Sequence, residues 1–209
     1  MTLIQQIDRV IAEKSLLKHP FYVAWTEGKL TKAMLREYAK QYYHHEAAFP
    51  TYLSAIHSNC PDIKIRQVIL DNMREEEMGE KNHPALWLQF ANALGLSKEE
   101  VTEAEPLPET SAMINTFRMI ARSRSTVEGL GAMYAYEVQI PEIARIKIEG
   151  LKKWYGIEKP EDIEFFTVHE KADEWHSQSE REIFLREATT EESKKCLVQA
   201  ISEACDALN

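Results

Sequence analysis

Apolar residues recur every three or four positions along most of the chain, the spacing that places them on one face of an α-helix. Residues that cap helices precede several of these runs: Thr2, Thr31, Ser97, Ser125 and Thr190. The predicted helices cover residues 2–18, 20–25, 32–58, 61–77, 84–93, 111–122, 126–150 and 167–186, with a short helix after 97 and a last one after 190. No segment fits the period of a strand better than that of a helix. We therefore predict an all-α fold with about seven main helices.

Prolines mark the interruptions in this pattern. Pro50 and Pro141 lie inside long runs, where we expect kinks because proline lacks the amide hydrogen that a regular helix uses. The clearest connecting loop is 103–109, which contains Pro106 and Pro108. The helical pattern resumes after this loop without a change of composition, and 209 residues suit one compact core. The sequence therefore predicts a single domain over residues 1–209.

The charge balance limits the classes of partner. The chain has 34 acidic residues and 25 Lys or Arg, a net charge of −9 that disfavours nucleic acid and anionic membrane surfaces. No apolar run reaches the roughly 18 residues of a membrane span, and the first residues lack the pattern of a signal peptide. We expect a cytoplasmic protein. Its three cysteines, Cys60, Cys196 and Cys205, form no CxxC pair and are interpreted as small apolar residues of the core.

Three residues of the run 167–186 have the spacing of metal ligands. His169, Asp173 and His176 stand at i, i+4 and i+7, so their side chains share one face of the helix and can converge on one point. Two imidazoles and a carboxylate that point the same way suit a transition metal. The alternative is a solvated helix face that carries an Asp/His ion pair.

A second candidate pair is Glu76 and His83, which stand seven residues apart, two turns along one face of an uninterrupted helix. Gly79 and Pro84 argue against an uninterrupted helix, and they favour a position for His83 at the start of the next one. A surface run of acids followed by a loop histidine is the alternative.

A single acid, Glu137, lies in the nearly uncharged segment 129–141, which we expect to be largely buried. Small residues in this segment (Gly129, Gly131, Ala132 and Ala135) would let neighbouring helices approach closely. A buried carboxylate is costly unless it is paired with or bound to a cation. The partner of Glu137 is therefore either a metal ion or a buried Arg or Lys.

Together these segments contain three carboxylates and three histidines, which is close to the set that holds two metal ions in helical proteins. Nitrogen and oxygen ligands without thiolate favour iron or manganese over a structural zinc. Centres of this kind bind and reductively activate O₂.

The segments 48–50, 52–58, 82–83, 134–141 and 169–173, with His176, resemble one family of haem-oxygenase-fold di-metal proteins. This is the family of the chlamydial protein associating with death domains (CADD), and the resemblance extends over essentially the whole chain. Thiaminase II-like and pyrroloquinoline-quinone-synthase-C-like proteins are similar at a greater distance. The resemblance implies a haem-oxygenase-like helical bundle, usually oligomeric, with a di-iron or mixed iron/manganese centre. The ligands that it implies are Glu76, His83, Glu137, His169, Asp173 and His176, and it alone distinguishes Glu76 from the acids beside it.

The family's proposed activity is the formation of p-aminobenzoate for folate biosynthesis, in an O₂-dependent oxidation that uses an external reductant and consumes side chains of the protein. The matching residues are Tyr22, which would supply the ring, Lys147, which would supply the nitrogen, and Tyr38, a second tyrosine near the metals. Removal of the lysine from water would lower its pKa and leave a free amine. Without the resemblance, Tyr22 would be interpreted as a core aromatic and Lys147 as a solvated surface lysine.

Three other functions are compatible with the sequence. A di-iron oxygenase that acts on an external small molecule would leave Tyr22 and Lys147 intact. A thiaminase-like hydrolase needs a cysteine nucleophile beside an acid, and none of the three cysteines lies in a segment with predicted ligands. A protein-interaction module would not depend on the six ligands, and no exposed apolar motif supports a death-domain-type partner. The resemblance also favours a homo-oligomer, most simply a homodimer.

Overall fold

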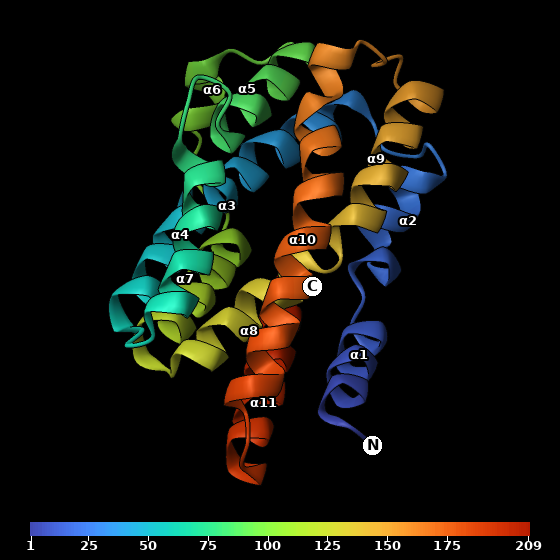
Figure 1. Ribbon diagram of the computed structural model, residues 1–209. Helices are drawn as coiled ribbons and strands as arrows, with labels where there is room; N and C mark the ends of the chain where they lie inside the picture. Colours follow the sequence, from blue (N-terminus) through green and yellow to red (C-terminus); the bar gives the residue numbers. More distant parts are fainter.

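The computed structural model describes the backbone of residues 1–209 and the side chains of residues 1–170 and 175–209. Along this backbone the chain forms α-helices and two short 3₁₀ helices, and no strand is present in the described residues (Figure 1). The helices are α1 (Leu3–Glu13), α2 (Pro20–Thr26), α3 (Lys32–Asn59), α4 (Ile63–Glu77), α5 (His83–Ala93), α6 (Lys98–Thr102), α7 (Pro108–Ser123), α8 (Thr126–Glu137), α9 (Ile140–Trp154), α10 (Glu164–Glu187) and α11 (Glu191–Leu208), with η1 (Leu16–Lys18) and η2 (Pro160–Ile163). The prediction of an all-α fold is confirmed. Nine of these helices have eleven or more residues, against the seven main helices expected.

The predicted capping residues begin the helices as expected. The side chains of Thr2, Thr31, Ser97, Ser125 and Thr190 each accept a hydrogen bond from a backbone N–H in the first turn of the following helix. These bonds satisfy donors that have no partner inside the helix. Local chemistry therefore fixes where α1, α3, α6, α8 and α11 start.

The largest difference from the sequence prediction is in residues 126–150, which form two helices instead of one. Pro141 has no amide hydrogen and its ring conflicts with the carbonyl of Glu137, so α8 ends at Glu137 and α9 begins at Ile140. The buried side chain of Gln139 occupies the break: its Oε1 accepts from the backbone N–H of Leu16 (2.9 Å), and its Nε2 donates to the carbonyl of Ala135 (2.7 Å).

Smaller differences occur at other helix ends. The first helix stops at Glu13, because Ser15 caps a separate 3₁₀ turn whose Leu17 N–H donates to the Ser15 hydroxyl. The fourth helix begins at Ile63 because the carboxylate of Asp62 caps it, two residues later than expected. The seventh begins at Pro108 and not at Ser111, as proline fits the first turn of a helix.

Helix α8 lies in the core, and its residues from Gly129 to Glu137 are all buried. It packs against α3, α7, α10 and α11. A Cβ atom on Gly131 would lie 2.5 Å from Cδ1 of Leu197 on α11, and one on Gly129 would lie 2.8 Å from Cγ1 of Ile56 on α3. The expectation that small residues allow close helix contacts here is confirmed.

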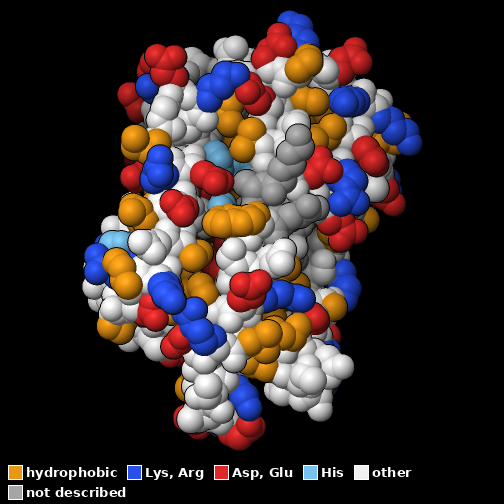
Figure 2. Space-filling model, viewed as in Figure 1, with side chains coloured by type: hydrophobic (Ala, Val, Ile, Leu, Met, Phe, Trp, Pro, Cys, Tyr) orange, Lys and Arg blue, Asp and Glu red, His pale blue; other side chains and the backbone are white. Residues whose placement is uncertain are grey.

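The surface is charged, and its two signs are mixed. Acidic and basic side chains are interspersed over the face seen in Figure 2, with apolar side chains in small groups among them. Within the part of the chain that the structure describes, no helix combines the length and apolarity that a membrane crossing requires.

Candidate functional site

The buried histidines and carboxylates gather where α3, α4, α5 and α10 meet. His83 is the first residue of α5, as Asn82 caps this helix and accepts from the Ala85 N–H (3.0 Å). Glu76 lies in the last turn of α4, and its Oε2 is 2.9 Å from Nδ1 of His83. Glu76 and His83 are 4% and 3% exposed, so the interpretation of this segment as a surface acid run with a loop histidine is wrong.

His169 faces this pair from α10. Its Nδ1 lies 2.8 Å from the carbonyl oxygen of Phe165, to which it donates, and this bond leaves the lone pair on Nε2. The rings of His169 and His83 are 4.1 Å apart between centroids. Burial, and then the charge of His83, hold the pKa of His169 well below its usual range, so the imidazole is neutral and able to bind a cation.

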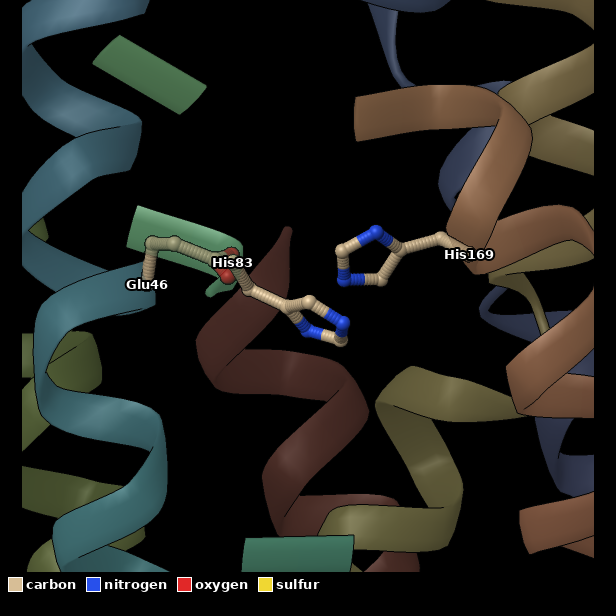
Figure 3. A group of neighbouring side chains, drawn as sticks. All are labelled: Glu46, His83 and His169. Atoms are coloured by element: carbon tan, nitrogen blue, oxygen red, sulfur yellow. The ribbon is translucent and has the colours of Figure 1, made fainter. Parts of the chain in front are cut away.

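Glu46 completes this group from α3, although it was not among the ligands predicted from the sequence. One ligand atom from each of Glu46, His83 and His169 lies within 4.8 Å of the others, and Figure 3 shows the three side chains directed toward a common space between their helices. A signal for Glu46 was present: it precedes the apolar residues 47–50, and the reasoning that identified Glu137 as a buried acid applies to it equally.

A second group of predicted ligands lies on the neighbouring side, where α8 meets α4 and α10. Glu137 Oε1 accepts a hydrogen bond from Nδ2 of Asn72 (2.8 Å) and lies 3.6 Å from Nδ1 of His176. His176 Nε2 is 3.4 Å from the more exposed carboxylate of Glu75. Two partners of Glu137 are thus an amide and an imidazole.

The structure therefore brings together five of the six predicted ligands, in two adjacent groups: Glu76, His83, Glu137, His169 and His176. The side chain of the sixth, Asp173, lies outside the described residues. His169 and His176 are each 3% exposed, so the interpretation of their helix face as solvated is wrong.

The arrangement fits metal ions. Burial raises the pKa of Glu76 well above its usual range, and the nearby carboxylate of Glu137 adds to this rise. The Glu76–His83 contact does not have hydrogen-bond geometry, and among the described residues neither of its two atoms has another hydrogen-bond partner. A cation between such groups would remove the cost of burying carboxylates close together. Oxygen and nitrogen donors of this kind suit iron or manganese.

An aromatic cluster surrounds Lys147 beside these groups. Lys147 is 2% exposed; its Nζ donates to the hydroxyl of Tyr38 (2.5 Å) and lies 5.4 Å from the ring centroid of Tyr22 and 5.0 Å from that of Tyr42. Burial lowers the pKa of Lys147 to about 7, although the charge of Glu46 opposes this effect. The interpretation of Lys147 as a surface lysine is wrong, because the break between α8 and α9 changes which residues of α9 face the core.

The phenols of this cluster remain protonated at neutral pH. Removal from water raises the pKa of Tyr22, with a hydrogen bond to Tyr38 as a smaller opposing effect. The same removal from water raises the pKa of Tyr38, and the neighbouring Tyr22 and Tyr42 add to it. The structure thus places an amine that is partly unprotonated at neutral pH among neutral phenols and close to the carboxylate and histidine groups.

Comparison with known proteins gives the family. A family model described as "Iron-containing redox enzyme" matches residues 36–209. The chain belongs to this family. It is 49% identical to the 4-aminobenzoate synthase of Nitrosomonas europaea, over 99% of this chain and 88% of that protein. It is 47% identical to the 4-aminobenzoate synthase of Chlamydia trachomatis, over 87% of this chain and 78% of that protein.

Solved structures show the same fold. A protein of Shewanella denitrificans with a haem-oxygenase-like fold matches with a TM-score of 0.80 at 21% identity, covering 99% of this chain and 88% of that one. A CADD-like protein of Nostoc punctiforme matches with a TM-score of 0.79 at 18% identity, covering 98% of this chain and 91% of that one. The haem-oxygenase-like fold and the family resemblance predicted from the sequence are confirmed.

Proposed function

We propose that this protein is a metal- and O₂-dependent oxidase that forms 4-aminobenzoate (p-aminobenzoate) for folate biosynthesis from its own Tyr22 and Lys147. The observation that carries the proposal is the position of Lys147, whose buried amine contacts Tyr38 and lies beside Tyr22 and next to the Glu46, His83 and His169 group. The names of the relatives from Nitrosomonas and Chlamydia support this product.

The proposed centre holds two metal ions, as iron with iron or iron with manganese. One ion would be held by Glu46, Glu76, His83 and His169. The other would be held by Glu137, Asp173 and His176. Bound metal supplies one chemistry, the activation of O₂ with electrons from an external reductant. Because the described members of both groups are buried within the helical bundle, the protein would exclude bulk water from that chemistry.

The carbon skeleton of the product supports Tyr22 as its source. 4-Aminobenzoate has a six-membered ring with one carboxyl carbon, and the tyrosine side chain has the same ring with Cβ para to the hydroxyl. Cleavage of the Cα–Cβ bond and oxidation of Cβ would give the carboxylate, with O₂ as the oxidant. With O₂ as the oxidant, the Lys147 amine would condense with the oxidised ring and the phenolic oxygen would leave as water. Hydrolysis would then break the lysine Cε–Nζ bond, which gives the free amine of the product and leaves Cε as an aldehyde.

Lys147 is the proposed nitrogen donor. Its lowered pKa leaves a substantial fraction of the amine unprotonated near neutral pH, and only this form has a lone pair for bond formation. The hydrogen bond to Tyr38 holds Nζ in place beside the ring of Tyr22. Tyr38 is thus proposed as a positioning residue.

The test uses protein labelled with ring-¹³C tyrosine and with ¹⁵N at the lysine side chain. Metal-loaded protein receives O₂ and reductant, and mass spectrometry follows the product and the peptides that contain positions 22 and 147. We expect doubly labelled 4-aminobenzoate and modified peptides in equal amount. The Tyr22→Phe variant should form none, whereas Tyr43→Phe, which changes a partly exposed phenol on α3, should match the wild type.

A cavity beside Tyr22 favours one second candidate, a di-metal oxygenase that acts on an external ring compound. Unlabelled product from an added substrate, with Tyr22 and Lys147 intact after many turnovers, would establish that function and refute the self-sacrificing one. A thiaminase-like hydrolase is less well supported, since no cysteine is among the described residues that line the cavity. Assembly as a homodimer stays a prediction, and a death-domain-type partner stays an alternative that the sequence does not support.

A further inference from the structure

A cavity of about 290 Å³ lies between η1, α2, α3, α7, α8 and α11, on the side of the aromatic cluster. Tyr22, Tyr38, Tyr42 and Tyr136 contribute phenols to its wall, and Leu16, Phe21, Met113 and Leu208 contribute apolar side chains. A protein cavity of roughly 150 Å³ is known to hold benzene, and drug-sized ligands occupy pockets of about 300 Å³ or more. The volume and the lining therefore suit one substituted aromatic ring.

His45 is the unexplained polar group in this wall. It is 2% exposed, and its ring packs against Tyr136, Phe117 and Phe49 at centroid distances of 5.0, 5.3 and 5.9 Å. Neither of its ring nitrogens has a hydrogen-bond partner among the described residues. Buried polar groups in native proteins almost always have such partners. A polar ligand in the cavity would supply the partner that this imidazole lacks.

A second imidazole, that of His19, lies in a less buried part of the same wall. Its Nδ1 accepts from the backbone N–H of Phe21 (3.2 Å), so in the neutral ring the proton is on Nε2. This N–H is a donor suited to a carboxylate near solvent. The cavity therefore has aromatic walls, a deeply buried imidazole and a partly exposed donor.

We propose that this cavity is a binding site for 4-aminobenzoate. The ring of the ligand packs among the phenols, its amine bonds to His45, and its carboxylate accepts from His19 near solvent. The assignment rests on the proposed function, because a ring released from position 22 would enter the cavity that Tyr22 lines. It also extends that function, since it gives the released product a defined site before it leaves.

The test is calorimetric titration of metal-loaded protein with 4-aminobenzoate and with benzoate, under anaerobic conditions in which no synthesis occurs. For the wild type we expect one site per chain and roughly tenfold tighter binding of 4-aminobenzoate, the worth of one hydrogen bond to the amine. The His45→Phe variant should bind both ligands with the affinity of benzoate. The matched variant His44→Phe, which changes the adjacent residue outside the cavity wall, should retain the tenfold preference.

A second pair of variants tests the position of the site. Met113→Trp places a large ring in the cavity and should abolish binding of both ligands, whereas Met119→Trp alters an exposed residue of the same helix and should have no effect. Circular dichroism and metal content establish that each variant is folded. If Met113→Trp does not fold, the comparison of His45→Phe with His44→Phe decides alone.

Two results would overturn the assignment: no binding to the wild type, or an unchanged preference in His45→Phe. The labelled synthesis assay, run in parallel with O₂, separates this inference from the proposed function. If the protein synthesises 4-aminobenzoate but does not bind it in the titration, the cavity assignment is refuted and the proposed function is not. Binding with the expected His45 dependence but without synthesis supports the cavity assignment and refutes the proposed function.

Discussion

Replacement of Lys147 by Met should change how the stability of the protein depends on pH. The side chain is 2% exposed, and burial lowers its pKa from 10.5 to about 7. At a pH between these two pKa values, Lys147 is protonated in the unfolded chain and mostly unprotonated in the folded chain. The free energy of unfolding therefore rises as the pH rises from about 7 to 10.5, and this gain in stability is lost as the pH falls back toward 7.

The size of the effect follows from the shift. One pKa unit corresponds to about 1.36 kcal/mol, so the wild type should gain roughly 2.5 kcal/mol over Lys147→Met between pH 7.5 and 9.5. Other groups titrate equally in both proteins and cancel in the difference. The variant also loses the bond to Tyr38, which shifts the two curves by a constant of about 1 kcal/mol but does not alter the slope.

The assay is urea unfolding followed by circular dichroism at pH 7.5, 8.5 and 9.5, with matched metal content in the two proteins. Lys152→Met, a change at an exposed lysine of the same helix α9, is the control and should not show this slope. A difference between wild type and Lys147→Met that stays constant over the three pH values would refute the buried, neutral amine. Lys147→Met should also form no 4-aminobenzoate.

Three further predictions concern the metal groups and the packing. His169→Ala and Asp173→Ala should each abolish iron loading with little loss of helicity, and a normal iron content measured by elemental analysis would refute the proposed ligands. Glu46→Gln should lower the iron content per chain, because the change removes a carboxylate from the Glu46, His83 and His169 group; an unchanged content would exclude Glu46 as a ligand. Gly150→Ala should destabilise the fold by roughly 1–3 kcal/mol in urea unfolding, since the added Cβ would lie 2.5 Å from Nε1 of the buried Trp25. Equal unfolding midpoints for the wild type and Gly150→Ala would refute this prediction, because they would show that Trp25 shifts without a cost in stability.

The parts of the fold that sequence predicted well are those determined locally. Capping side chains such as Thr31 and Ser125 bond to the backbone within their own first turn, and their effect can be recognised from spacing alone. The break between α8 and α9 at Pro141 is determined only partly by local sequence. A proline predicts a disturbance, but whether the helix kinks or ends depends on contacts such as that of Gln139 with Leu16, 123 residues away in sequence.

The candidate site also contains both residues whose position follows from local sequence and residues whose position depends on distant contacts. His169 and His176 share a helix, so their common face follows from their spacing, and Glu137 was identified as a buried acid because its neighbours are small and apolar. Glu46 and Lys147 were harder to place. Their burial results from contacts among α3, α5, α9 and α10, and the direction of a side chain on α9 depends on how α8 ends.

Under the proposed function, loss of the buried Tyr22 ring would shorten the lifetime of the protein in a cell. The ring packs edge-on against Phe21, with centroids 5.4 Å apart, and forms part of the core. Loss of a buried aromatic ring typically costs about 3–5 kcal/mol, a large share of the stability of an ordinary domain. A chain that had given up this ring would unfold more often and would be cleared faster by proteases. Protein molecules that had lost the Tyr22 ring would thus be degraded because they are less stable. The supply of 4-aminobenzoate would then depend on the rate at which new protein is synthesised.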